Sequence, residues 1–332
     1  MYLLLYDTVN MCRHFRSCEW WILLLVSSSL KRGYMSKTDI KKKYYILDPI
    51  VESYWKEVEA LYLNPNLADE VSYGELYREY EEDVKKKQGL SIGCDFLIYR
   101  TIKLLSAELK EYALVNAKIA KLTAKTAIKI GDFGQYNAFA NDPMEKGYYK
   151  NLENAEIAEW ILTGNSKHQE LINCLTKLRN TYGGFNRKWS LEDKKDAIYM
   201  WILPSVLFGD IKEARRNYDL LVDSSKFDVK KIEYNGRDII KTSFVLLEYL
   251  EGKENLKEIA SATMEEFFYN MTGWGREGNK PRDRIWYDIT EKWALCVARI
   301  RAKYFTGETD PIKITQSLRY MYECMRPVKN DC

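Results

Sequence analysis

Glycine and basic residues cluster between residues 273 and 284, a composition suited to binding anions. Gly273, Gly275 and Gly278 have the G-x-G-x-x-G spacing that lets backbone amides approach a pyrophosphate. A dinucleotide site also needs a strand before this motif, whereas a helix ending near Met271 is expected here. The amides and nearby side chains could still hold an anion, a phosphate or a partner's carboxylates. The side chains concerned are those of Trp274, Arg276, Lys280, Arg282 and Arg284. The alternative is a solvated connector between two helices.

Two further connectors carry the same mixture of basic and aromatic residues. Phe185, Arg187 and Trp189 follow a glycine pair, and Lys230 lies in the basic stretch 226–231. If the helices form a stack of hairpins, the connectors between hairpins gather along one edge of the stack. Arginine and tryptophan dominate the energetics of protein interfaces, so this edge predicts a partner protein with an acidic surface. Its residues are Phe185, Arg187, Trp189, Lys230, Trp274, Arg276, Lys280, Arg282 and Arg284.

Short motifs that resemble catalytic sites lack the context that those sites need. The tripeptide Asp-Phe-Gly at 132–134 occurs in protein kinases, but no glycine-rich loop, strand lysine or H-R-D loop precedes it, and we expect it to end a helix. Glu251 and Lys253 have the spacing of a nuclease motif that normally lies on strands. With His14 and His168 as the only histidines, no multi-histidine metal site is expected. The sequence favours a protein that is not an enzyme and has no metal or cofactor.

Composition and charge indicate a globular cytoplasmic protein. Apolar residues make up 46% of the 332 residues, and 51 Lys and Arg nearly balance 48 Asp and Glu. This balance argues against nucleic acid or a membrane surface as the partner. The seven cysteines show no close C-x-x-C pair, so we expect reduced thiols, mostly in helix cores.

Residues 1–34 differ from the rest of the chain. They contain an apolar run, Trp20–Val26, that is too short to span a bilayer. The sequence from Met35 onward is polar and helix-forming. Back-translation places a purine-rich stretch of coding DNA just before the codon of that methionine. We expect translation to start at Met35, with residues 1–34 an extension outside the fold. A signal segment and a genuine N-terminal arm are the alternatives.

Helix start and stop signals divide the first part of the body. Asp48 and a following proline open a helix that runs to about Leu63. A capping box at Ser72 opens a second helix, which ends near Gly89. A long helical stretch is predicted from about Cys94 to Ile130, because it contains no Pro or Gly and keeps its apolar residues at helical spacing.

The second part contains four helix ends with a similar sequence, an apolar residue and one further residue before a glycine. These glycines are Gly164, Gly209, Gly252 and Gly307, spaced 45, 43 and 55 residues apart. Each is followed by a new helix start, at Ser166, Asp210, Asn255 or Asp310. We therefore predict a tight turn between two antiparallel helices at each glycine. The edge that carries these turns would be acidic. Acidic residues are expected there even without a binding role, because they stabilise helix N-termini. Its residues are Asp210, Glu213, Glu254, Glu258, Glu308 and Asp310.

The segment Phe208–Ala214 resembles the turn of tetratricopeptide-type repeats, and the region 151–326 resembles the α-solenoid class to which they belong. This resemblance implies stacked helical hairpins. It also implies binding of proteins or peptides, which is the usual function of this class. The predicted fold is all-α, with an N-terminal helical region over 36–150 and about four stacked hairpins over 151–326.

The predicted function is protein–protein interaction without catalysis. A bacterial toxin-neutralising immunity protein and a repeat-type regulator are the roles we favour, by fold-level analogy. One alternative is an enzyme that acts on a phosphorylated substrate through the loop 273–284. A second alternative is a helical protein that binds nucleic acid, which the near-zero charge disfavours.

Overall fold

A computed structural model describes residues 49–62, 90–106, 108–132, 143–165, 169–181, 185, 187–227, 238–272 and 285–318. Of these, 85% are helical and none lies in a strand, so the described chain is all-α as predicted. By its internal contacts the chain divides into residues 1–52 and 53–332. The fold below is that of the second unit. The extension expected over residues 1–34 and the helix expected between Ser72 and Gly89 lie outside the described residues.

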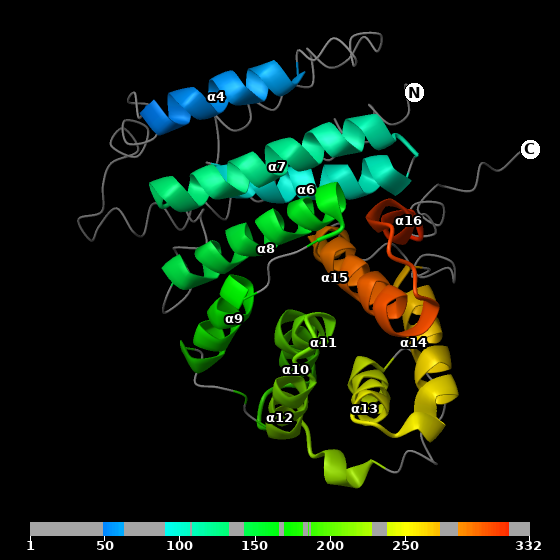
Figure 1. The fold of residues 1–332 in the computed structure, drawn as a ribbon. Coiled ribbons are helices and arrows are strands. Elements are labelled where there is room, and N and C mark those ends of the chain that lie inside the picture. The colour runs from blue at the N-terminus through cyan, green and yellow to red at the C-terminus, as the bar shows by residue number, and fades with distance from the viewer. Residues whose placement is uncertain are drawn as a thin grey trace, which may run out of the picture. The chain divides into compact units, whose positions relative to one another are not determined.

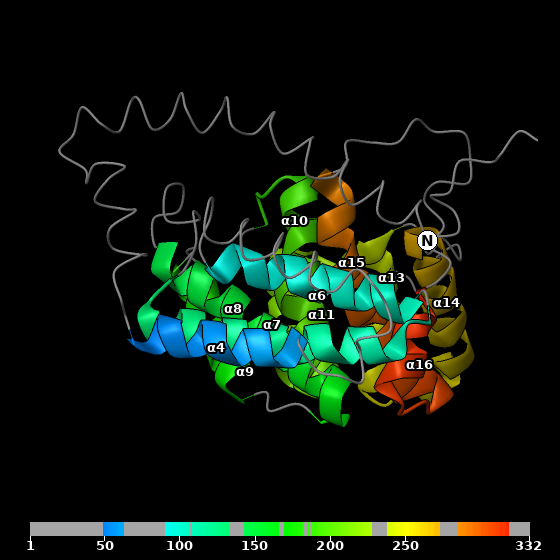
Figure 2. The same cartoon turned by 90° about the horizontal axis from the view of Figure 1, so that it is seen from above.

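The first described helices form a layer of neighbouring elements (Figures 1 and 2). Helix α4 (Pro49–Tyr62) begins at the proline, as predicted. Helices α6 (Leu90–Ser106), α7 (Lys110–Ile130) and α8 (Pro143–Thr163) all pack on one another. The hydroxyl groups of Tyr54 on α4 and Thr123 on α7 are 2.9 Å apart and hydrogen-bonded. The last described helices of the chain pack on α6 and α8 of this layer.

The prediction of one long helix over 94–130 was wrong, because the chain reverses direction between α6 and α7. Glu108 adopts a left-handed conformation (φ 66°), and the amide of Leu109 bonds the carbonyl of Leu104 at 2.9 Å. The reversal packs the apolar face of α6 on that of α7, and Cys94 Sγ donates to the carbonyl of Ala120 at 3.2 Å. A continuous helix would leave both faces in water, so burial outweighs the cost of one strained residue.

The four glycines predicted to lie in turns all have positive φ: 74° at Gly164, 86° at Gly209, 102° at Gly252 and 71° at Gly307. The helices on either side of each glycine contact each other. These pairs are α8 with α9 (Gln169–Thr181), α11 (Leu203–Leu207) with α12 (Ile211–Leu221), α13 (Ile239–Leu250) with α14 (Lys257–Thr272), and α15 (Ile285–Arg301) with α16 (Pro311–Gln316).

Two of the predicted helix starts are confirmed and one is wrong. The side chains of Asp210 and Asp310 accept hydrogen bonds from the first turns of α12 and α16. Asn255 does not cap α14, because it lies within a 3₁₀ turn, Glu254–Leu256, that leads into the helix. Ser166 lies outside the described residues. A capping box that was not predicted, at Ser190, opens α10 (Leu191–Ala197).

Helices α10 and α11 are joined by a π-helical turn at Ile198–Ile202, and a second π-helical turn, Ala302–Thr306, follows α15. The second turn packs against the end of α11. The hydroxyl of Tyr304 donates to the carbonyl of Val206 at 2.8 Å, and Lys303 Nζ donates to that of Leu207 at 2.7 Å. Both carbonyls lie in the last turn of α11, and that of Val206 also accepts a hydrogen bond from the amide of Gly209 at 3.0 Å.

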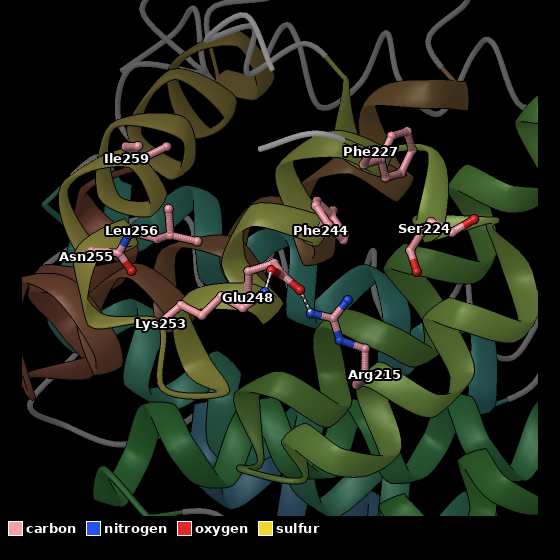
Figure 3. Close-up of a pocket in the computed structure, with 10 residues that line it drawn as sticks. Arg215, Ser224, Phe227, Phe244, Glu248, Lys253, Asn255, Leu256 and Ile259 are labelled. Atoms are coloured by element: carbon pink, nitrogen blue, oxygen red, sulfur yellow. Dashed lines mark hydrogen bonds and ion pairs between the residues drawn. The ribbon is translucent and has the colours of Figure 1, made fainter. Parts of the chain in front are cut away.

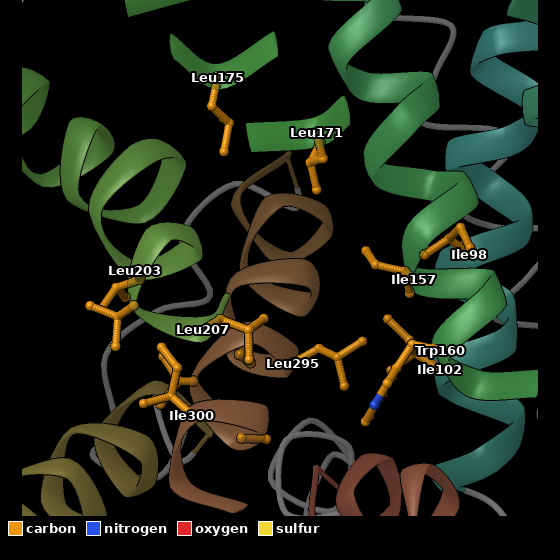
Figure 4. Packing of buried hydrophobic residues seen from close by; sticks show 14 of the residues in the cluster. Ile98, Ile102, Ile157, Trp160, Leu171, Leu175, Leu203, Leu207, Leu295 and Ile300 are labelled. Atoms are coloured by element: carbon orange, nitrogen blue, oxygen red, sulfur yellow. The ribbon is translucent and has the colours of Figure 1, made fainter. Parts of the chain in front are cut away.

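The last hairpin packs against the first helices. Helix α15 contacts α6, α11 and α14, and α16 contacts α6 and α8. Figure 4 shows Leu295 of α15 and Trp160 of α8 within this core. In a simple row of hairpins each one contacts only its neighbours, so these contacts differ from those of a simple row, and the stacked arrangement stays a prediction. The boundary predicted near residue 150 falls inside α8, and residues 53–332 form one unit by their contacts.

Candidate functional site

The first connector of the predicted binding edge is described in part, and its two aromatic residues anchor it to the core. The rings of Phe185 and Trp189 are half-buried and both contact Trp201, with centroids 5.4 and 6.3 Å from it. Both rings pack against the core, and the role of these residues in binding a partner stays a prediction. The other six predicted edge residues lie outside the described residues: Lys230, Trp274, Arg276, Lys280, Arg282 and Arg284.

Arg187 connects the first connector to the beginning of the second. Its guanidinium is exposed and donates to the carbonyl of Asp219, in the last turn of α12, at 2.8 Å. A hydrogen bond from Ser225 lowers the pKa of Asp223, and the charges of Lys226 and Arg187 lower it further. The described part of the first connector therefore lies next to the end of α12, where the second connector begins. The binding edge itself stays a prediction.

Two leucines are exposed beside these connectors. The side chain of Leu191, at the start of α10, is 58% exposed, and that of Leu220, near the end of α12, is 50% exposed. Among the described residues of 53–332, these are the exposed large hydrophobic side chains. We call the set the connector surface, and its residues are Arg187, Lys188, Leu191, Leu220 and Lys226.

A groove of about 610 Å³ opens next to the connector surface, between α12, α13 and the start of α14. Figure 3 shows its two apolar sides facing each other. Phe227 and Phe244 form one side, with ring centroids 5.2 Å apart. Leu256 and Ile259 form the other. Ser224, Ser225 and Asn255 add polar groups at its rim.

Charged residues close one end of the groove. Arg215 donates to Glu248 Oε1 at 2.6 Å and to Glu251 at 2.9 Å, and its guanidinium lies 5.4 Å from the ring centroid of Phe244. Lys253 pairs with the same Glu248 from the other side. Glu248 is buried, whereas the Lys253 side chain is 56% exposed. Glu251 is 34% exposed but does not line the groove, so the exposed charge among the lining residues is the Lys253 ammonium.

The acidic residues predicted along the turn edge are occupied within the chain where the structure describes their contacts. Asp210 and Asp310 cap helices, and Glu308 accepts hydrogen bonds from the amides of Thr309 and Asp310. Glu213 pairs with Arg179 and Arg216. These contacts favour the capping interpretation of that edge over a binding role.

A buried ionic network joins α15 to α6 and α8, and the sequence analysis missed it. Lys292 Nζ lies 2.6 Å from Asp95 Oδ1 and 3.5 Å from Glu153 Oε2. Burial alone would lower the pKa of Lys292, but the charges of Asp95 and Glu153 raise it well above its usual value. The partners are up to 197 positions apart in the sequence. The available signal was the presence of charged residues seven apart, Lys292 and Arg299, on the apolar face of a helix.

Arg299 makes the second contact of this network. Its guanidinium donates two hydrogen bonds to Glu156, at 2.7 and 3.0 Å, and lies 4.3 Å from the ring centroid of Trp160. Lys292 and Arg299 are two helical turns apart, so they hold α15 at two points of one face. The network fixes the position of α15 and is structural.

Two other groups with chemical potential also serve the fold. Asp132, the first residue of the kinase-like tripeptide, is buried and accepts a 2.6 Å hydrogen bond from the amide of Leu90 at the start of α6. It follows Gly131, which ends α7 in a left-handed conformation as predicted. Burial raises the pKa of the Cys94 thiol, and raises that of Cys296 to about 12, so both stay protonated at neutral pH.

Comparison of the chain with protein-family models, curated proteins and solved structures finds no match. Within the described helices, none combines the length and apolar character needed to cross a bilayer. The same residues contain no group of three or more His, Cys, Asp or Glu side chains placed to hold a metal ion.

Proposed function

We propose that this protein binds another protein, and that its connector surface docks on an acidic surface of that partner. The observation that carries this proposal is the position of the exposed leucines. Leu191 follows the connector that contains Arg187 and Lys188, and Leu220 is adjacent in sequence to Asp219, whose carbonyl accepts the hydrogen bond from Arg187. Protein interfaces usually have an apolar core surrounded by a polar rim.

The charges of this surface favour an acidic partner. The carboxylates of Asp219 and Asp223 accept hydrogen bonds from the hydroxyl groups of Ser224 and Ser225 and are engaged within the chain. Arg187 has five N–H donors, of which the bond to Asp219 uses one, and the Lys226 side chain is 77% exposed. Lys226 pairs with Asp223 at 3.4 Å, but its side chain is more exposed than those of Asp223 and Asp219, which are 39% and 45% exposed.

The proposal is tested by affinity capture with the tagged full-length protein from a lysate of the cells that make it. We expect the wild type to retain a protein with an acidic surface, and to retain less of it as the salt concentration rises. Leu220→Asp and Lys226→Glu should each lose this protein, because one removes an apolar anchor and the other reverses a charge.

Lys118→Glu is the matched control for the charge reversal, since Lys118 is an exposed lysine on α7, away from the connectors. It should retain the partner as the wild type does. Capture that is equal for the wild type, Leu220→Asp and Lys226→Glu would overturn the assignment to this surface.

A toxin-neutralising role is the narrower form of the proposal, and fold-level analogy supports it. In that case a gene next to this one should encode a toxin that kills cells lacking this protein. Co-expression should protect those cells, and Leu220→Asp should lose the protection. Neighbouring gene products that are harmless on their own would contradict this narrower role.

A further inference from the structure

We propose that the groove beside the connector surface binds a bulky apolar side chain of an acidic peptide segment, with a neighbouring carboxylate of that segment on Lys253. This inference rests on the proposed function and names the part of the partner that this chain recognises. The described residues bring together three features that support it: two apolar walls, an exposed ammonium and continuity with the connector surface.

The walls determine the apolar part of the ligand. Phe227 and Phe244 face Leu256 and Ile259 across the groove (Figure 3). Phe244 and Leu256 are buried and form fixed parts of the walls, whereas Phe227 and Ile259 are half-buried and reach the opening. A large aliphatic or aromatic side chain inserted here would cover the exposed parts of both walls, and burial of apolar area favours this.

The charged end determines the polar part of the ligand. Glu248 is neutralised from two sides, by Arg215 and by Lys253. The Lys253 ammonium has three N–H donors, and its pair with Glu248 leaves donors on the exposed side for a second carboxylate. A cationic ligand would meet this ammonium at the opening and be repelled, so charge complementarity selects an acidic ligand.

The shape of the groove favours a chain segment over a small molecule. Small-molecule sites enclose most of the ligand surface, whereas the described residues form a groove that is open to solvent. Its walls come from two successive hairpins, α11–α12 with its following turn and α13–α14. Phe227 directly follows Lys226 of the connector surface, so one partner segment can contact both.

The test uses random peptides displayed on phage and selected on the immobilised full-length protein. We expect the enriched peptides to share a bulky apolar residue next to an acidic one. The most enriched peptide is then synthesised with a fluorophore and titrated by fluorescence anisotropy. Lys253→Glu and Ile259→Asp should each weaken its binding by about tenfold or more, the loss of one charged or apolar contact. Circular dichroism verifies that each variant is folded.

Lys257→Glu is the matched control, because Lys257 is exposed at the start of α14 and does not line the groove. It should bind the peptide as the wild type does. A separate selection on Lys253→Glu should enrich peptides with a basic residue in place of the acidic one, which only direct contact with residue 253 explains.

Several results would overturn the inference: no enrichment, enriched peptides without an acidic residue, or equal binding by the wild type, Lys253→Glu and Ile259→Asp. If Leu220→Asp abolishes binding and the groove variants do not, the connector surface alone binds the peptide and only the groove assignment fails. If the groove variants abolish binding and Leu220→Asp does not, the peptide binds in the groove alone, and capture of the cellular partner by Leu220→Asp decides the connector surface separately.

Discussion

Arg299 and Glu156 form an ion pair with both side chains more than nine-tenths buried. Such a pair stabilises a fold little relative to apolar side chains, but removal of one partner leaves the other charged and desolvated. We expect Arg299→Ala to lower the free energy of unfolding by about 3–5 kcal/mol. Urea denaturation followed by circular dichroism measures this change.

Two controls accompany the Arg299 variant. Lys195→Ala breaks an exposed pair with Glu192 and should cost less than about 1 kcal/mol. The double variant Glu156→Leu with Arg299→Met should recover most of the loss, because no buried charge remains. If Arg299→Ala costs no more than Lys195→Ala, the pair is not buried as described.

The pKa of Asp95 determines how this network responds to acid. Burial alone would raise its pKa, but the charges of Lys292 and Lys150 and the hydrogen bonds from Lys292 and Asn154 together outweigh burial and lower the pKa. A carboxyl group with a lowered pKa stabilises the fold above its unfolded-state pKa of about 3.9, and this stabilisation is lost as the pH falls through the folded-state pKa. The difference in unfolding free energy between the wild type and Asp95→Asn should therefore be largest near neutral pH and shrink below about pH 4. A difference that does not change with pH would contradict this role of Asp95.

At the scale of the elements, a substitution at Glu108 tests whether residues 94–130 form two helices or one. In the structure it is a left-handed residue between α6 and α7. Glycine adopts this conformation without strain, so Glu108→Gly should raise the free energy of unfolding by up to about 1 kcal/mol. If residues 94–130 formed one continuous helix, the same change would lower it by about 1 kcal/mol. The sign of the change in a denaturation experiment decides between the two.

Local signals explain which elements the sequence predicted correctly. The turn glycines and the caps Asp210 and Asp310 act through hydrogen bonds within a few residues, so their positions follow from the local sequence. The break at Glu108 has no glycine or proline to mark it, because it is imposed by packing of α6 on α7. Tertiary contacts override helix propensity at that point.

The candidate site was predictable only in part for the same reason. The basic and aromatic content of the connectors indicated a binding edge, and Arg187 does meet the end of α12. The groove was not predicted, because it forms between residues as far apart as Arg215 and Ile259. Charge and hydrophobicity can be read along a chain, whereas the two walls of a groove depend on how hairpins pack.

At the scale of the whole molecule, the last hairpin is held against the first helices. Lys292 and Arg299 lie on one face of α15 and pair with acids of α6 and α8. Buried ion pairs specify an arrangement more than they stabilise it, since only the correct register satisfies both charges. We infer that the ionic network sets how α15 docks within residues 53–332.

The central claim is that a partner binds at the connector surface, and amide hydrogen exchange of the full chain with and without the captured partner tests it most directly. The account predicts slower exchange at residues 187–191 and 219–227 in the complex, because these segments would be covered. Exchange in the turn at residues 307–310, between α15 and α16, should not change. Slower exchange at 307–310 with none at 187–191 and 219–227 would contradict the account.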